Sequence, residues 1–94
     1  MVFEVGKCYL HTSGITICIL GKVNTIKWGK NALFGEMSLN GGVPELTVVG
    51  PDTIVAYGYE EIDFSEYKTI NRITTNKKEF EDIIASNAPF NLKE

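Results

Sequence analysis

The sequence has no long apolar run, one histidine, two cysteines and only nine basic residues among 94. Its longest apolar stretch, residues 15–20, is interrupted by Thr16 and falls far short of the roughly 20 residues that cross a bilayer. The first residues contain no basic segment followed by an apolar one, so no signal peptide is expected. These absences predict a protein that has no membrane partner and stays in the cytoplasm.

Positive charge is scarce, and the formal net charge is −3. A protein that binds DNA or RNA polymers needs a basic surface to displace counterions, so such partners are not expected. Residues 1–44 hold four lysines and two glutamates, whereas residues 45–94 hold five basic and ten acidic residues. An anionic ligand would therefore meet the first half of the chain, and the lack of arginine there favours a small ligand.

Short β-type segments separated by glycine-containing turns dominate the chain. They cover residues 8–12, 15–28, 32–39, 45–49 and 53–57, with turns at 29–31, 40–42 and 50–52 and a bulge or bend at Gly21. This spacing predicts one mainly β domain over residues 1–94, a small antiparallel Src-homology-3-like barrel or rolled sheet of about five strands.

The sequence period changes near the C-terminus. Asn76 followed by Glu79 has the spacing of a helix cap. Three apolar residues that follow share one helix face: Phe80, Ile83 and Ile84. We expect an α-helix over residues 76–86 that ends before Pro89 and either covers an open end of the barrel or forms an oligomer contact. Asp63 indicates a single earlier helical turn by the same spacing.

Ser13-Gly14 lies between two β-type segments and predicts a two-residue hairpin turn. In that register Cys8 and Cys18 point to opposite faces of the sheet, which predicts buried free thiols instead of a disulfide. A three-residue loop would change the pairing. Two cysteines and one histidine do not favour a zinc site, which usually takes at least three protein ligands, so we expect no metal and no other cofactor.

The predicted register also gives the hairpin a less apolar face that carries Tyr9 and His11 beside the turn. Aromatic rings stack on nucleobases, and the hydroxyls of Thr12 and Ser13 can donate to phosphate oxygens together with the turn amides. These four residues are candidate ligand contacts. The alternative interpretation is structural: Tyr9 packs under the rim of the barrel and His11 is solvated.

Four further residues are candidates: Lys27, Trp28 and Glu36 on chemical grounds, and Thr25 as a neighbour of Trp28 in the sequence. Trp28 lies between lysines near Thr25 and can stack on a base while an ammonium group meets phosphate. Glu36 can accept hydrogen bonds from the amino group of a base. Each has an ordinary alternative, because a single tryptophan in a small β domain is often core and Glu36 can face outward from an alternating strand.

Residues that would form a catalytic centre are missing from the sequence. There is no second histidine, no nucleophile elbow and no phosphate-binding loop ending in Gly-Lys-Ser/Thr. We therefore expect no catalytic residues and no enzymatic activity.

The string from Gly6 to Gly14, together with Thr25, Glu36 and Glu61-Ile62, resembles a group of short phage-encoded β proteins. These proteins open with a Gly-Lys-x-Tyr-x-His-x-x-Gly hairpin and later carry a Glu-Ile pair that leads into a short helix. The match covers about the first two-thirds of the chain. The group is identified with the phage cyclic-nucleotide sponges that blunt CBASS immunity.

This resemblance implies a homo-oligomer, of a tetrameric type, that sequesters cyclic dinucleotides such as 3′3′-cyclic GMP-AMP in the host cytoplasm without degrading them. Some relatives would take related nucleotide signals of Thoeris immunity. It also implies that four hairpin residues contact the ligand: Tyr9, His11, Thr12 and Ser13. Two other functions stay open. One is a structural or protein-interaction module of a phage that uses a sheet edge or the C-terminal helix; the other is a weak single-strand binder, which the charge disfavours.

Overall fold

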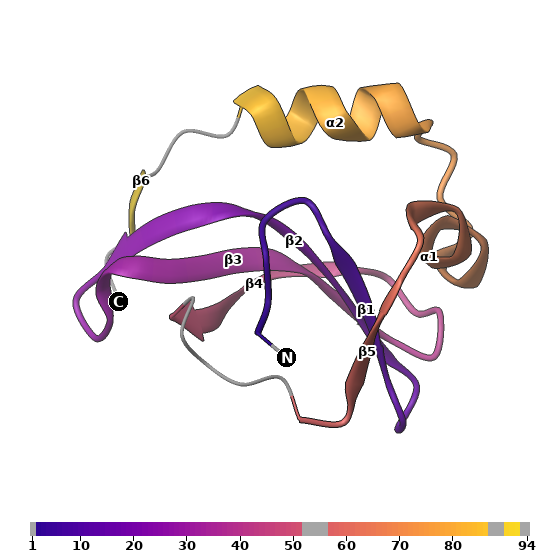
Figure 1. Cartoon of the computed structure of the whole chain (residues 1–94), viewed down its shortest axis with the longest axis horizontal. Helices are drawn as coiled ribbons and strands as arrows, with labels where there is room; N and C mark the ends of the chain where they lie inside the picture. Colours follow the sequence, from indigo (N-terminus) through magenta and orange to yellow (C-terminus); the bar gives the residue numbers. More distant parts are fainter. Residues whose placement is uncertain (1, 52–56, 87–89, 93–94) are drawn as a thin grey trace.

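The computed structural model describes residues 2–51, 57–86 and 90–92. Its elements are β1 (Cys8–His11), β2 (Ile15–Thr25), β3 (Gly29–Leu39), β4 (Glu45–Pro51), β5 (Tyr59–Ile62), α1 (Phe64–Asn71), α2 (Lys77–Ser86) and β6 (Phe90–Leu92). Five antiparallel strands form one sheet in the order β4-β3-β2-β1-β5, and β6 pairs in parallel with the end of β2 (Figure 1). The predicted mainly β fold is confirmed.

The β1–β2 hairpin differs from the prediction because its loop has three residues, 12–14. Gly14 has a φ of 95° and donates its N–H to the His11 carbonyl oxygen at 2.9 Å. A left-handed glycine at the third position is typical of three-residue hairpin loops. The extra loop residue shifts the pairing, so that Cys8 lies directly opposite Cys18. The two cysteines therefore share one face, contrary to the prediction, and both are buried and form no disulfide.

The long β2–β3 hairpin contains the bulge expected at Gly21. The pairing shifts between Ile19 and Gly21, which leaves Leu20 as the extra residue. Beside the bulge, Gly35 approaches the backbone of Cys18 so closely that a Cβ at position 35 would collide with the Cys18 carbonyl oxygen. Only glycine permits that approach.

Two predicted turns are misplaced. The turn between β2 and β3 lies at 26–28 instead of 29–31, because Gly29 already pairs with Thr25. The turn predicted at 50–52 is also wrong at positions 50 and 51, because β4 continues through Pro51. Residues 53–56 of the predicted fifth strand lie outside the described residues, and β5 has no counterpart among the predicted strands.

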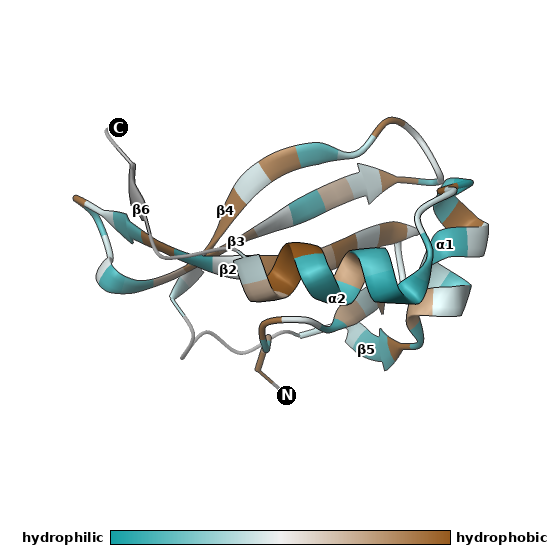
Figure 2. Cartoon of the chain, turned by 90° about the horizontal axis from the view of Figure 1, so that it is seen from above, coloured by the Kyte–Doolittle hydropathy of each residue, from teal (hydrophilic) through white to brown (hydrophobic). Residues whose placement is uncertain are grey.

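Each face of the sheet carries a cluster of buried residues. The face under α1 and α2 carries one apolar cluster, which includes Cys8, Cys18, Leu20, Phe34, Tyr67 and Phe80. The opposite face carries a second cluster of Phe3, Tyr9, Ile17, Ile19 and Leu33. Figures 1 and 2 show α2 lying across the first of these faces, with α1 at its end.

The C-terminal helix α2 begins after Asn76, as predicted. Asn76 Oδ1 accepts the Glu79 N–H at 2.8 Å, and Asn76 Nδ2 donates to Glu79 Oε1 at 2.7 Å, which caps the first turn. Phe80 is buried against the sheet, whereas Ile83 is 44% exposed. The earlier helix, α1, has 8 residues and is longer than the single turn predicted. Neither helix in the described ranges is long and apolar enough to cross a membrane.

A buried polar cluster fixes α1 to the sheet. Asn71 Nδ2 donates to Thr16 Oγ1 and to the Tyr67 carbonyl oxygen, each at 3.0 Å, and Asn71 Oδ1 accepts the Ser38 hydroxyl. The three polar side chains are at most 8% exposed. Because each has hydrogen-bonding partners inside the protein, this cluster orients the helix and offers nothing to a ligand.

Candidate functional site

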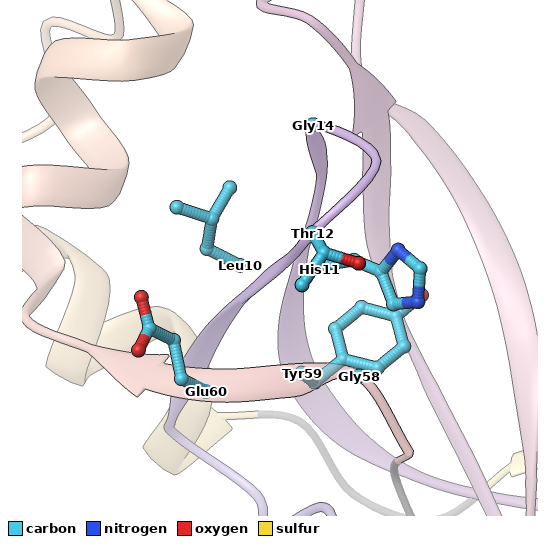
Figure 3. Close-up of a pocket in the computed structure, with 7 residues that line it drawn as sticks. All are labelled: Leu10, His11, Thr12, Gly14, Gly58, Tyr59 and Glu60. Atoms are coloured by element: carbon cyan, nitrogen blue, oxygen red, sulfur yellow. The ribbon is translucent and has the colours of Figure 1, made fainter.

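An open cleft of about 540 Å³ lies at the loop end of the β1–β5 ladder, and we call it the β1–β5 cleft (Figure 3). Its lining residues are Leu10, His11, Thr12, Gly14, Gly58, Tyr59 and Glu60. The volume lies within the range of about 300–1,000 Å³ that small-molecule sites occupy. Two of the predicted ligand contacts, His11 and Thr12, line this cleft, and a third, Ser13, bonds to His11.

His11 is oriented by its own loop. The Ser13 N–H donates to His11 Nδ1 at 3.0 Å, and Ser13 Oγ lies 2.7 Å from the same nitrogen. A ring nitrogen that accepts a backbone N–H carries no proton, so the neutral imidazole carries its proton on Nε2. The loop thereby sets the tautomer and leaves Nε2 as the donor of the ring.

Tyr59 places a second ring against His11. The ring centroids are 4.7 Å apart and the planes are tilted by 58°. His11 and Tyr59 are paired in the β1–β5 ladder, so backbone hydrogen bonding holds both half-buried rings on one face. Figure 3 shows them together, while Leu10 and Glu60 point to the other side. Burial raises the pKa of the Tyr59 hydroxyl, which is therefore a neutral donor near pH 7.

Gly58 provides the space that this ring pair needs. Its φ is 78°, and a Cβ on it would lie 2.5 Å from His11 Nε2 and 2.9 Å from Cδ2. The Gly58 carbonyl oxygen accepts the Thr12 N–H at 3.2 Å, which ties the β1–β2 loop to the chain just before β5. A side chain at position 58 would therefore displace the imidazole.

The electrostatics of the cleft favour hydrogen bonding over ion pairing. The described lining contains one carboxylate, Glu60, and no lysine or arginine. Lys7 lies outside the lining and bonds to Glu4 at 2.9 Å and Glu61 at 3.2 Å, and these carboxylates raise the pKa of Lys7. A phosphate here would take its donors from His11 Nε2 and the Thr12 hydroxyl, whereas Glu60, on the other side of the ladder, would accept from an amino group.

Tyr9 does not lie in the cleft, although the sequence predicts that it projects beside His11. Its ring is 1% exposed and packs edge-on against Phe3, with centroids 4.9 Å apart. Its hydroxyl oxygen accepts the Glu4 N–H at 2.9 Å. The expectation of an exposed ring is wrong because the N-terminal segment covers this face, which leaves Tyr9 no free surface for stacking.

Thr25, Lys27 and Trp28 form a separate group at the opposite end of β2. Thr25 Oγ1 accepts the backbone N–H of Trp28 at 2.8 Å. Lys27 Nζ lies 4.8 Å from the centre of the Trp28 ring. Trp28 is half-buried against the helix-side cluster. Glu36 lies in neither group, since it faces α1 and accepts a hydrogen bond from the Tyr67 hydroxyl at 3.4 Å. The structure therefore does not join these four residues to the β1–β5 cleft.

The sequence reasoning missed Tyr59, Gly58 and Glu60. The one local signal is the Tyr57-Gly58-Tyr59 string, in which a glycine turn precedes an aromatic residue. Among the described residues, no group of three or more His, Cys, Asp or Glu side chains is arranged to hold a metal ion.

Comparisons with protein-family models, curated proteins and solved structures found nothing that matches the chain. The functional interpretation therefore rests on the chemistry of the β1–β5 cleft and on the sequence pattern of the first hairpin.

Proposed function

We propose that this protein is a non-enzymatic binding protein that captures a small nucleotide in the β1–β5 cleft and releases it unmodified. The observation that carries the proposal is the His11–Tyr59 ring pair, which lies beside a loop with two exposed hydroxyls. A base can stack on the rings while the Thr12 hydroxyl donates to a phosphate oxygen. The hairpin resemblance adds the ligand class, cyclic dinucleotides such as 3′3′-cyclic GMP-AMP.

In this proposal the site is shared between subunits. Small-molecule sites bury about 70–90% of their ligand, and a cleft open to solvent on one chain does not reach that fraction. A second copy placed over the cleft would supply the missing surface, consistent with the tetrameric assembly that the resemblance implies. The protein would act by stoichiometric capture in the host cytoplasm, which removes the signal of CBASS-type defence.

Thermal unfolding in the presence of a ligand panel tests the proposal. The panel contains cyclic dinucleotides, cyclic ADP-ribose isomers and short oligonucleotides. A ligand that binds the folded state raises the melting temperature by mass action. His11→Ala should weaken its binding about fivefold to 140-fold, since stacking is worth roughly 1–3 kcal/mol per base. Lys27→Ala, at the far end of β2, is the matched control and should leave the affinity unchanged.

A release assay separates capture from catalysis. The protein is mixed with cyclic GMP-AMP, free nucleotide is removed by filtration, and the bound fraction is recovered by heating. Intact nucleotide supports a sponge, whereas a linear or cleaved product contradicts the proposal and indicates an enzyme. An unchanged melting temperature with every ligand also contradicts it.

A protein-interaction module is the second candidate, and the exposed apolar residues near β4 favour it. Leu39, Val43 and Leu46 are 59%, 87% and 64% exposed. They lie around the β3–β4 turn and on β4, an end strand of the described sheet, where backbone groups are available for pairing with another chain. Under this alternative, Leu46→Lys would abolish partner binding and His11→Ala would not.

A further inference from the structure

A second cavity lies between the helices and the sheet, and we call it the helix-side cavity. Its volume is about 60 Å³, and its lining residues are Cys18, Leu20, Glu36, Phe64, Tyr67, Ile73, Thr75, Phe80 and Ile83. It shares no lining residue with the β1–β5 cleft and lies on the face that α1 and α2 cover. The two sites are therefore made of different residues.

Glu36 is the one charged side chain in the described lining of this cavity. It pairs with Cys18 across the β2–β3 ladder, so both side chains face the helices. The Tyr67 hydroxyl, at 3.4 Å, is its single hydrogen-bond donor among the described residues, and no described lysine, arginine or histidine is within ion-pair distance of Glu36. Glu36 is half-buried, has one long hydrogen bond and has no described countercharge, so its carboxylate can accept further hydrogen bonds from a cation.

Apart from Glu36 and Thr75, the lining consists of apolar, aromatic and cysteine side chains. Phe64 stacks on Phe80 with centroids 4.3 Å apart, and Tyr67 lies 6.4 Å from Phe64. Aromatic faces attract cations, most strongly where the cation is shielded from water. A hard metal ion would need several oxygen ligands, whereas this cavity offers one carboxylate. The combination therefore selects an organic cation that carries both N–H groups and alkyl carbons.

We propose that the helix-side cavity binds the head of a small alkylammonium ion. The N–H groups donate to Glu36, and the alkyl carbons lie against Phe64, Phe80 and Tyr67. A volume of about 60 Å³ admits a headgroup of only a few non-hydrogen atoms. One lining residue, Ile83 on α2, is 44% exposed, so the cavity borders solvent there.

An NMR titration of the full chain with dimethylammonium chloride tests this site. Saturable shifts are expected at the amides that line the helix-side cavity, with none at the β1–β5 cleft. Sodium chloride at equal ionic strength controls for screening, and acetone serves as an uncharged molecule of similar size. Equal shifts with acetone would overturn the proposed charge recognition, and equal shifts with sodium chloride would overturn the site.

Matched glutamate variants assign the charge contact. Glu36→Gln keeps the side-chain shape and removes the charge, so it should weaken dimethylammonium binding at least tenfold. Glu60→Gln, in the other site, should leave that affinity unchanged, and Tyr67→Phe should change it less than threefold because the ring stays. Unchanged binding by a folded Glu36→Gln variant would refute the proposal. If that variant does not fold, the comparison with acetone on the unmodified protein still decides the question.

Discussion

Replacing Tyr9 separates its core position from the ligand-contact role that the sequence predicts. Tyr9→Ala removes a ring that is 1% exposed and packs on Phe3, and it leaves the Glu4 N–H without its phenolic acceptor. Buried aromatic-to-alanine substitutions cost about 3–5 kcal/mol. Domains have a total stability of about 5–15 kcal/mol, so the variant should lose a large fraction of its free energy of unfolding.

Tyr9→Phe divides that loss into its two parts. It keeps the ring in the cluster and removes only the hydroxyl, so the cost should be about 0.5–1.5 kcal/mol, the net value of one hydrogen bond. For a domain of 60–100 residues, each kcal/mol lowers the melting temperature by about 4–8 °C. Tyr9→Ala should therefore lower it by at least about 12 °C, and Tyr9→Phe by roughly 2–12 °C.

Urea denaturation followed by Trp28 fluorescence, with circular dichroism as the second probe, measures both losses. His11→Ala is the control, because His11 is the next residue on the same face of β1 but is only half-buried. It should cost no more than about 1.5 kcal/mol. A Tyr9→Ala variant that stays within about 1 kcal/mol of the unmodified protein while losing ligand binding would refute the core placement.

Three further predictions concern helix capping, the cleft and alkaline pH. Asn76→Ala removes the cap of α2 and should cost about 1 kcal/mol in thermal unfolding; an unchanged melting temperature would contradict the capping geometry. Gly58→Ala should weaken ligand binding because its Cβ meets the His11 ring. Gly29→Ala is the matched control: Gly29 has a φ of 66° and open space around it, so the substitution carries similar backbone strain and should leave binding intact. The hydrogen bond with Cys8 and burial raise the pKa of the Cys18 thiol, and burial raises that of the Tyr67 hydroxyl. The unfolded chain therefore loses these protons first, at about pH 8.5 for the thiol and pH 10 for the phenol. The free energy of unfolding should fall as the pH rises above those values, and Tyr67→Phe should flatten the decline above pH 10 in urea denaturation series.

Short-range signals in the sequence were sufficient for several features. The Asn76–Glu79 cap, the bulge at Gly21 and the mainly β character appear in the structure as predicted. Each depends on residues that are neighbours in the chain, because capping and bulges are satisfied within a few positions of backbone. Of the candidate contacts, His11 and Thr12 line the β1–β5 cleft, and their role in binding stays a prediction.

The tertiary structure decided the rest. One additional loop residue moved Cys18 opposite Cys8. The flanking strands alternate equally well in either register, so they do not distinguish a three-residue loop at 12–14 from a two-residue loop at 13–14. The burial of Tyr9 depends on Phe3, and the second ring of the cleft, Tyr59, comes from a strand far along the chain. Alternation assigns residues to a face, but which segment covers that face is set by contacts between distant parts of the chain, and these appear only when the chain is folded.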